Sequence, residues 1–205
     1  MGYSPAGAIG LSGKLVAAFA GVYLLAAQFG LAFRAEPSDV AVFWPASSVA
    51  AGALILFGRR AYPALALGVV IGTVVANLLS DRQLLTSLLK GLCNAGEAVL
   101  ISWLLERWFG RSFAFSDIRQ VFGLAAATAA AAVSAVGGAT IMTALHTTAP
   151  FWEVWNAWLL SDGVGIVVVA PLVIRLGQAW REPYDGDHLH PRAFGIVCRK
   201  TLARG

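Results

Sequence analysis

Long apolar runs separated by short polar segments cover most of the sequence. Each run holds at least about 18 residues, which lets a helix cross a hydrocarbon core of roughly 30 Å. The six runs span residues 15–33, 40–57, 61–79, 84–105, 121–145 and 151–176. The pattern predicts an all-α fold, a polytopic integral membrane bundle of about six transmembrane helices.

Composition supports this interpretation. The chain is 58% hydrophobic and 13% charged, against about 25% charged for soluble domains. We expect a short cytoplasmic N-terminus at 1–13, a six-helix membrane domain at 14–176 and a basic cytoplasmic tail at 177–205, which is too short for a core of its own. The first run exceeds the roughly 7–15 apolar residues of a signal peptide, and only Lys14 precedes it as a basic residue, so it is expected to be a retained helix.

The basic residues are distributed unevenly between the loops. Twelve of the 15 Lys and Arg residues fall on one side when the N-terminus, the turn at 58–60, the loop at 106–120 and the tail are placed together. Arg34 and Arg82 fall on the other side, and Lys90 lies within a span but nearer to that side. Because basic loops stay in the cytoplasm, both termini are predicted to be cytoplasmic. The basic residues flank membrane helices and form no aromatic-interleaved patch, which argues against a nucleic-acid partner.

Polar residues inside the runs carry most of the functional information. Ser87, Lys90, Asn94 and Glu97 are three or four residues apart and therefore share one helix face. Asp162 lies near the middle of the last run, where a carboxylate costs roughly 2.5–3.5 kcal/mol on insertion scales. Such groups should face the bundle interior. With the deduced topology, these residues fall at the midplane or in the outer leaflet: Trp44, Ser47, Ser48, Asn77, Lys90, Asn94, Glu97 and Asp162.

Two interpretations of this set are open. It can form a site for a ligand, an ion or a proton, or Lys90 can pair with Glu97 or Asp162 as a structural clamp. Hydrogen bonds between membrane helices average only about 0.6 kcal/mol, a small gain for burying three ionisable groups, which favours a functional site. An outer vestibule is expected to be lined by Trp44 and Ser48. The candidate ligand- or proton-sensing residues are Asp162, Glu97, Asn94, Lys90, Trp44, Ser48 and Asn77.

Other features favour packing over chemistry. Ala64, Gly68, Gly72 and Ala76 recur every four residues, a small-residue stripe that lets a neighbouring helix approach closely. Residues 137–138, a Gly-Gly pair, could kink the fifth helix. No Cys/His spacing suits a metal, no cofactor is indicated, and the serines lack a nucleophile-elbow setting, so we do not expect an enzyme.

Three segments in the right order resemble a known family. They are FWPASSVAAGALILFGRRAYPALALGVVIGTVVANL at 43–78, the polar helix face of Asn94 and Glu97, and WNAWLLSDGVGIVVVAPLVI at 155–174. Together they resemble the bacterial membrane-associated sensor domain of the first type (MASE family, type one), over its first six helices. Ser48 stands where the family usually has glycine.

The resemblance implies a multi-pass sensory module of the bacterial inner membrane. It would relay a signal to a cytoplasmic output such as a diguanylate cyclase, a phosphodiesterase or a histidine kinase, and so act in cyclic-di-GMP or two-component signalling. The family usually continues through about two more helices, so the membrane domain is expected to be incomplete at its C-terminal end, or to act through a partner protein. A homodimer is left open. The alternative is a six-helix substrate-binding subunit of a vitamin-type importer, which would also have an outward pocket and cytoplasmic termini.

Overall fold

The computed structural model describes residues 5–110, 113 and 117–180, with side chains from residue 13 onward. Helices make up nearly all of this part, and one short antiparallel hairpin follows the first helix. In chain order the elements are α1 (Pro5–Leu31), β1 (Arg34–Ala35), β2 (Val40–Ala41), α2 (Pro45–Phe57), the 3-10 turn η1 (Arg59–Ala61), α3 (Tyr62–Leu78), α4 (Leu84–Phe109), α5 (Ile118–Thr128), α6 (Ala130–Leu145) and α7 (Phe151–Ala179).

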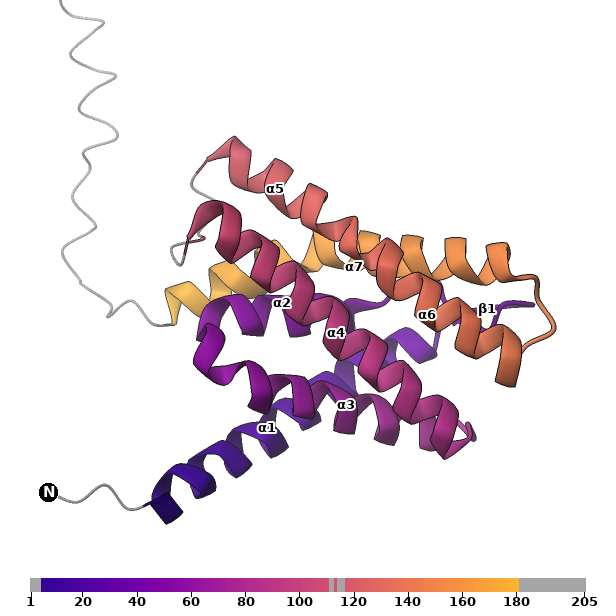
Figure 1. Cartoon of the computed structure of the whole chain (residues 1–205), viewed down its shortest axis with the longest axis horizontal. Helices are drawn as coiled ribbons and strands as arrows, with labels where there is room; N and C mark the ends of the chain where they lie inside the picture. The colour runs from indigo at the N-terminus through magenta and orange to yellow at the C-terminus, as the bar shows by residue number, and fades with distance from the viewer. Residues whose placement is uncertain (1–4, 111–112, 114–116, 181–205) are drawn as a thin grey trace, which may run out of the picture.

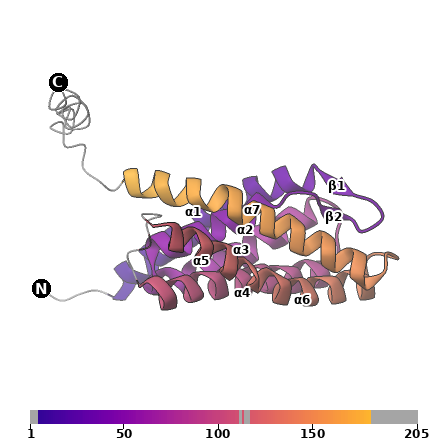
Figure 2. The same ribbon diagram turned by 90° about the horizontal axis from the view of Figure 1, so that it is seen from above.

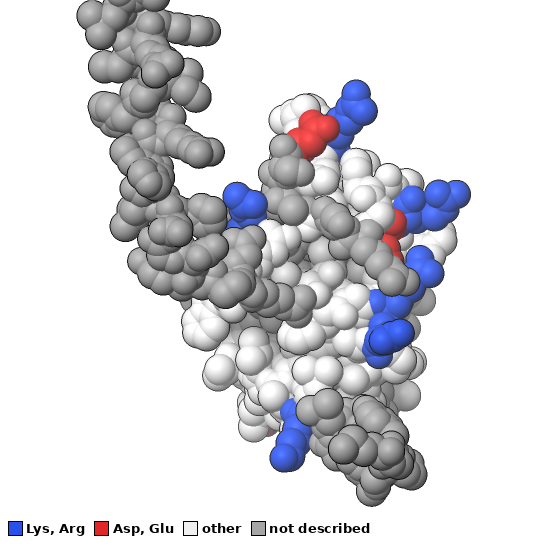
Figure 3. Space-filling model, turned by 90° about the vertical axis from the view of Figure 1, so that its left-hand side faces the viewer, with Lys and Arg blue, Asp and Glu red and all other residues white. Residues whose placement is uncertain are grey.

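The helices run alternately up and down the bundle. Figures 1 and 2 show that α1 begins and α7 ends at the same end, which we call the termini end. The β1–β2 hairpin, the α3–α4 turn and the α6–α7 turn lie together at the opposite end, the hairpin end. Figure 3 looks onto the termini end, where Lys and Arg dominate the charged side chains on an otherwise uncharged surface.

Five of the helical segments are long and apolar enough to cross a membrane, and α2 is a shorter apolar helix of 13 residues. The prediction of a polytopic bundle of about six transmembrane helices is therefore confirmed. Large apolar side chains such as Leu25, Phe122 and Leu160 point outward, while many polar side chains are buried. This inside-out distribution is what a lipid solvent requires.

The second span begins differently from the prediction. Residues 40–44 are extended rather than helical, and α2 begins only at Pro45. Proline suits the first helical position and forces the residue before it out of the helical region, as seen at Trp44 (φ −117°, ψ 82°). Non-helical backbone at membrane depth survives only where protein covers it or a cavity adjoins it. Here the backbone N–H of Trp44 donates to the Ser161 carbonyl in the middle of α7.

The fifth span is interrupted, but not at its glycine pair. The break between α5 and α6 falls at Ala129, next to Thr128, whose hydroxyl donates to the Leu124 carbonyl one turn back. Such back-bonding by threonine bends helices. Gly137 and Gly138 lie within regular α6 instead. A Cβ at Gly138 would come within 2.6 Å of the Trp158 ring, so this glycine makes room for the indole.

The small-residue stripe of α3 lies against α1. A Cβ added at Gly68 would come within 3.0 Å of Phe19, and one added at Gly72 within 2.8 Å of Tyr23. Farther along the same interface, the Gln28 amide donates to the Ala76 carbonyl. The stripe therefore brings the two backbones close together.

A second close approach, between α2 and α7, was not predicted. Added Cβ atoms would lie 2.7 Å from Val173 at Gly52, 2.3 Å from Leu56 at Gly177 and 2.5 Å from the Trp44 carbonyl oxygen at Gly165. These three glycines are spread along the helix pair. The two helices are consequently packed tightly from the middle of the bundle to the termini end.

Candidate functional site

The polar face of α4 points into the bundle. Ser87, Lys90, Asn94 and Glu97 are between 0% and 8% exposed. Asn94 donates through its amide to the Tyr23 hydroxyl at 3.1 Å and to Thr73 Oγ1 at 3.4 Å. The periodicity of this helix thus places a cation, an amide and a carboxylate where three other helices can reach them.

Asp162 meets this face from α7. Its Oδ1 accepts a 3.0 Å hydrogen bond from the Ser47 hydroxyl in the first turn of α2. The carboxyl groups of Asp162 and Glu97 are neighbours that interact electrostatically. Among the described residues, Oδ2 of Asp162 and both carboxyl oxygens of Glu97 are buried without a hydrogen bond of ordinary geometry. Buried acceptors left this way are costly unless something else binds them.

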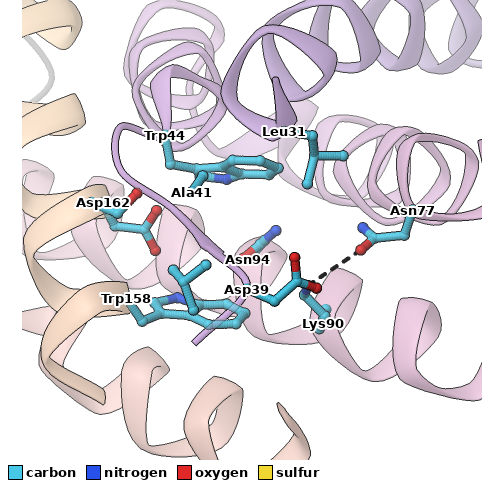
Figure 4. Close-up of a pocket in the computed structure, with 11 residues that line it drawn as sticks. Leu31, Asp39, Ala41, Trp44, Asn77, Lys90, Asn94, Trp158 and Asp162 are labelled. Atoms are coloured by element: carbon cyan, nitrogen blue, oxygen red, sulfur yellow. Dashed lines mark hydrogen bonds between the residues drawn. The ribbon is translucent and has the colours of Figure 1, made fainter. Parts of the chain in front are cut away.

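A pocket lies beside Asp162 and extends toward the hairpin end. Its cavity has a volume of about 30 Å³, room for about two water-sized groups before any side chain moves. Figure 4 shows the indoles of Trp44 and Trp158 on opposite sides of the pocket, with Asp162 at one end and the Lys90–Asn77 pair at the other. The residues that line it are Leu31, Asp39, Val40, Ala41, Trp44, Asn77, Lys90, Asn94, Trp158, Ser161 and Asp162.

Trp44 is held in place by two glycines. A Cβ at Gly30 of α1 would lie 2.6 Å from the Trp44 ring, and Gly165 of α7 lies against its carbonyl. The extended segment before α2 is therefore pinned between two helices, with the indole over the pocket. Irregular backbone at this depth lines a cavity, the situation in which membrane proteins tolerate it.

Lys90 is bound at the other end of the pocket. Its ammonium donates to the Asn77 side-chain oxygen at 3.2 Å and lies 5.6 Å from the centre of the Trp158 ring, a cation–π distance. The Asn77 amide in turn donates to the Thr73 carbonyl. The Asn77 side chain thus forms a hydrogen bond within the last turns of α3 and also orients the Lys90 ammonium.

An ion-pair cluster adjoins the pocket at the hairpin end. Asp39 pairs with Arg82 from the α3–α4 turn, with His146 after α6, and with Arg34 at 3.5 Å. The Arg82 side chain is almost fully buried. Burial lowers the pKa of its guanidinium, and the Asp39 carboxylate acts in the opposite direction. The cluster ties three loops together across the end of the pocket.

The structure brings most of the predicted sensing residues together. Asp162, Asn94, Lys90, Trp44 and Asn77 all line the pocket. Two do not: Glu97 lies behind Asp162, and Ser48 is fully buried toward Gly165. The expected vestibule wall of Trp44 and Ser48 is therefore made by Trp44 alone, because one helical turn carries Ser48 below it.

Three polar or aromatic lining residues, Asp39, Trp158 and Ser161, were not predicted from the sequence. Trp158 precedes Asp162 by four residues and so shares its helix face, a signal that was available in the sequence. Ser161 and Asp39 carried no comparable signal. Ser161 adjoins the carboxylate but is not one turn from it, and Asp39 reaches the pocket through a hairpin that no periodicity predicts.

Fold and site define a class: a multi-pass helical membrane protein with a polar pocket inside its membrane domain. The chain belongs to the MASE1 family, whose model matches residues 15–202. The resemblance noted from the sequence is thereby confirmed, and MASE1 domains are membrane-associated sensory domains. No curated protein and no solved structure matches the chain.

Proposed function

We propose that the pocket between Trp44, Trp158, Lys90 and Asp162 is the input site of this sensory domain. A small molecule bound there would favour one of two arrangements of the surrounding helices. The domain would pass this change to a cytoplasmic output, a diguanylate cyclase, a phosphodiesterase or a histidine kinase. Family membership supports the sensory role over the importer alternative, which rests on helix number and chain length alone.

The observation that carries this proposal is the concentration of unsatisfied polar atoms around one cavity. Asn94, Ser161 and Asp162 all line the pocket. Asn94 Oδ1 and Ser161 Oγ are buried without a hydrogen-bond partner among the described residues, while the Asp162 carboxyl interacts with Ser47, Glu97 and Trp158. A purely structural network would satisfy its own members, because each unpaired buried group costs about 1–3 kcal/mol. A binding site leaves them for its ligand.

The helices around the pocket suggest how a signal would travel. Trp44 begins α2 and Asp162 belongs to α7, and the glycines at 52 and 177 pack these two helices tightly toward the termini end. A ligand that moves either residue would therefore move the helix pair together. Pro171 lies in α7 between the pocket and the termini end, where the missing N–H makes bending easier. Such a ligand acts only through different affinities for the two arrangements.

The proposed orientation places the termini end in the cytoplasm and the pocket toward the outside. Among described residues, the termini end carries six basic residues, Lys14, Arg59, Arg60, Arg107, Arg119 and Arg175, and two acidic ones, Glu106 and Asp117. The hairpin end carries Arg34 and Arg82 together with four acidic residues, Glu36, Asp39, Asp81 and Glu153. The predicted basic tail lies outside the described residues. A reporter that works only in the cytoplasm, fused behind Gly205, should be active; a silent but stably expressed fusion would refute this orientation.

The functional test uses the full chain fused behind Gly205 to a diguanylate cyclase. Cyclic-di-GMP should vary with growth medium for the wild type and stay at one level for Asp162→Asn, which keeps the shape and removes the charge. Glu153→Gln is the matched control, because it makes the same carboxylate-to-amide change on an exposed position of α7. If Asp162→Asn and Glu97→Gln both respond like the wild type at equal membrane levels, the buried carboxylates are scaffolding and the proposal fails.

A further inference from the structure

The pocket has an acidic side chain at one end and a basic side chain at the other. Asp162 lies at one end, with Glu97 behind it, and Lys90 lies at the other. Asp39 also lines the pocket beside Lys90, and its carboxylate is paired with Arg82. One end therefore presents carboxyl groups and the other presents an amine beside an ion-paired Asp39, with the two indoles between them.

The acceptors at the Asp162 end match one kind of donor. Asn94 Oδ1 and Ser161 Oγ have no hydrogen-bond partner in the described part of the chain, and the Asp162 carboxyl beside them interacts with Ser47, Glu97 and Trp158. These three residues are 2–4% exposed. An ammonium group carries three N–H donors on one atom, so one such group can serve three acceptors. The indole of Trp44 beside it offers a π-face to the same cation.

At the other end, the Lys90 ammonium has N–H donors that can bind a further acceptor. The structure gives this ammonium one hydrogen bond, to Asn77, although a lysine has three N–H donors. A ligand carrying only positive charge would meet Lys90 over the face of Trp158. A ligand carrying only negative charge would meet Asp162 and Glu97. Like charges brought together in a site of low polarity are strongly disfavoured.

We infer that the pocket binds a small zwitterion of the amino-acid type, with its ammonium at Asp162, Asn94 and Ser161 and its acidic group at Lys90. This inference rests on the proposed function, since it names the class of ligand for the same site. The short apolar part of the molecule lies between the indoles of Trp44 and Trp158.

Matched small molecules test the charge pattern directly. The purified full chain in lipid nanodiscs is titrated with glycine, β-alanine and γ-aminobutyrate, which differ in the separation of their charges. Each is paired with the amine and the acid that lack one charge: methylamine and acetate, ethylamine and propionate, propylamine and butyrate. At least one zwitterion should raise the thermal unfolding temperature and bind saturably, while its paired amine and acid do not.

Two variants then assign the ends. Asp162→Asn and Lys90→Met should each weaken binding of that zwitterion by about 30-fold or more, as loss of a buried charge partner does. Lys90→Met should improve binding of the paired amine, because the repelling charge is gone, and Glu153→Gln should bind like the wild type. Binding of an amine or an acid as tightly as the zwitterion, or binding of none of the zwitterions by folded wild-type protein, overturns the inference.

The outcomes separate the two proposals. If an amine alone binds, and the cyclase fusion still loses its response in Asp162→Asn, the proposed sensory site is supported and the inference of a zwitterionic ligand is refuted. If the zwitterion binds as described, but Asp162→Asn leaves the fusion's response intact, the inference of a zwitterionic ligand is supported and the sensory role of the pocket is refuted.

Discussion

The interiors of the two halves of the bundle differ in polarity. Toward the termini end, α4, α5, α6 and α7 meet in an apolar cluster, with Ile101, Leu105, Ile166 and Ile174 fully buried. Toward the hairpin end, α1, α3, α4 and α7 and the segment before α2 enclose Asn94, Asp162 and an open pocket. The change occurs within one turn of α7, between Asp162 and Ile166. A single helix thus joins a part suited to recognition with a part suited to rigid transmission.

The comparison shows why unsatisfied groups can be tolerated. Apolar packing stabilises both halves, because the hairpin end has its own cluster around Met142, Val154 and Trp158. The polar half can then keep groups unpaired for a ligand at a tolerable cost. Substitutions should therefore affect stability and recognition differently in the two halves.

The largest effect on stability is expected in the apolar half. Leu105→Ala removes a fully buried side chain and should lower the free energy of unfolding by about 2–5 kcal/mol, through lost contacts and the cavity left behind. Leu92→Ala is the matched control, on the same helix but 61% exposed toward lipid. Equilibrium unfolding in mixed micelles measures both. Equal losses in the two variants would contradict the assigned core.

A smaller effect is expected where α1 and α3 approach. Gly72→Leu forces a side chain into the space of Tyr23 and the Ala20 carbonyl and should destabilise by about 1–3 kcal/mol through overfilling. Gly21→Leu makes the same change at a position with nothing within 4 Å. Thermal unfolding in detergent should separate them. Should Gly72→Leu be as stable as Gly21→Leu, the stripe would not be a packing surface.

The smallest effect distinguishes the halves most directly, because it compares two buried serines. Ser102 donates to the Ala51 carbonyl at 3.3 Å, so Ser102→Ala should cost about 0.5–1.5 kcal/mol. Ser161 has no hydrogen-bond partner for its hydroxyl in the described chain, so Ser161→Ala should leave stability unchanged or slightly improved. The same unfolding assay tests the pair. A larger loss for Ser161→Ala would show that its hydroxyl is already satisfied.

Sequence reasoning succeeded where one helix contains the whole signal. The inward face of α4 follows from the spacing of Lys90, Asn94 and Glu97, and the depth of Asp162 follows from its place in an apolar run. It failed where the decisive contacts join distant segments. Pro45 was a local signal that α2 begins there, but the extended path of residues 40–44 depends on hydrogen bonds to Phe33 and Ser161, which local sequence does not indicate.

The glycines also show that contacts between distant segments cannot be predicted from local sequence. The four-residue repeat in α3 was visible as a packing stripe, whereas Gly52, Gly165 and Gly177 form a close approach only when α2 and α7 are placed side by side. The pair at 137–138 was expected to kink its helix. Its actual partners, Cys93 and Trp158, come from other helices, so local flexibility gave the less accurate interpretation.

The short second helix has a consequence for biosynthesis. At 13 residues, α2 is about 20 Å long and cannot cross a bilayer as a stable span by itself. The backbone N–H of Trp44 and the hydroxyl of Ser47 both find their partners in α7, at Ser161 and Asp162. Because α7 emerges from the ribosome after α2, these groups of Trp44 and Ser47 lack their partners until α7 has inserted beside α2. The pocket is thus complete only after α7 has inserted, and a chain interrupted before Phe151 would lack the hydrogen-bond partners of Trp44 and Ser47.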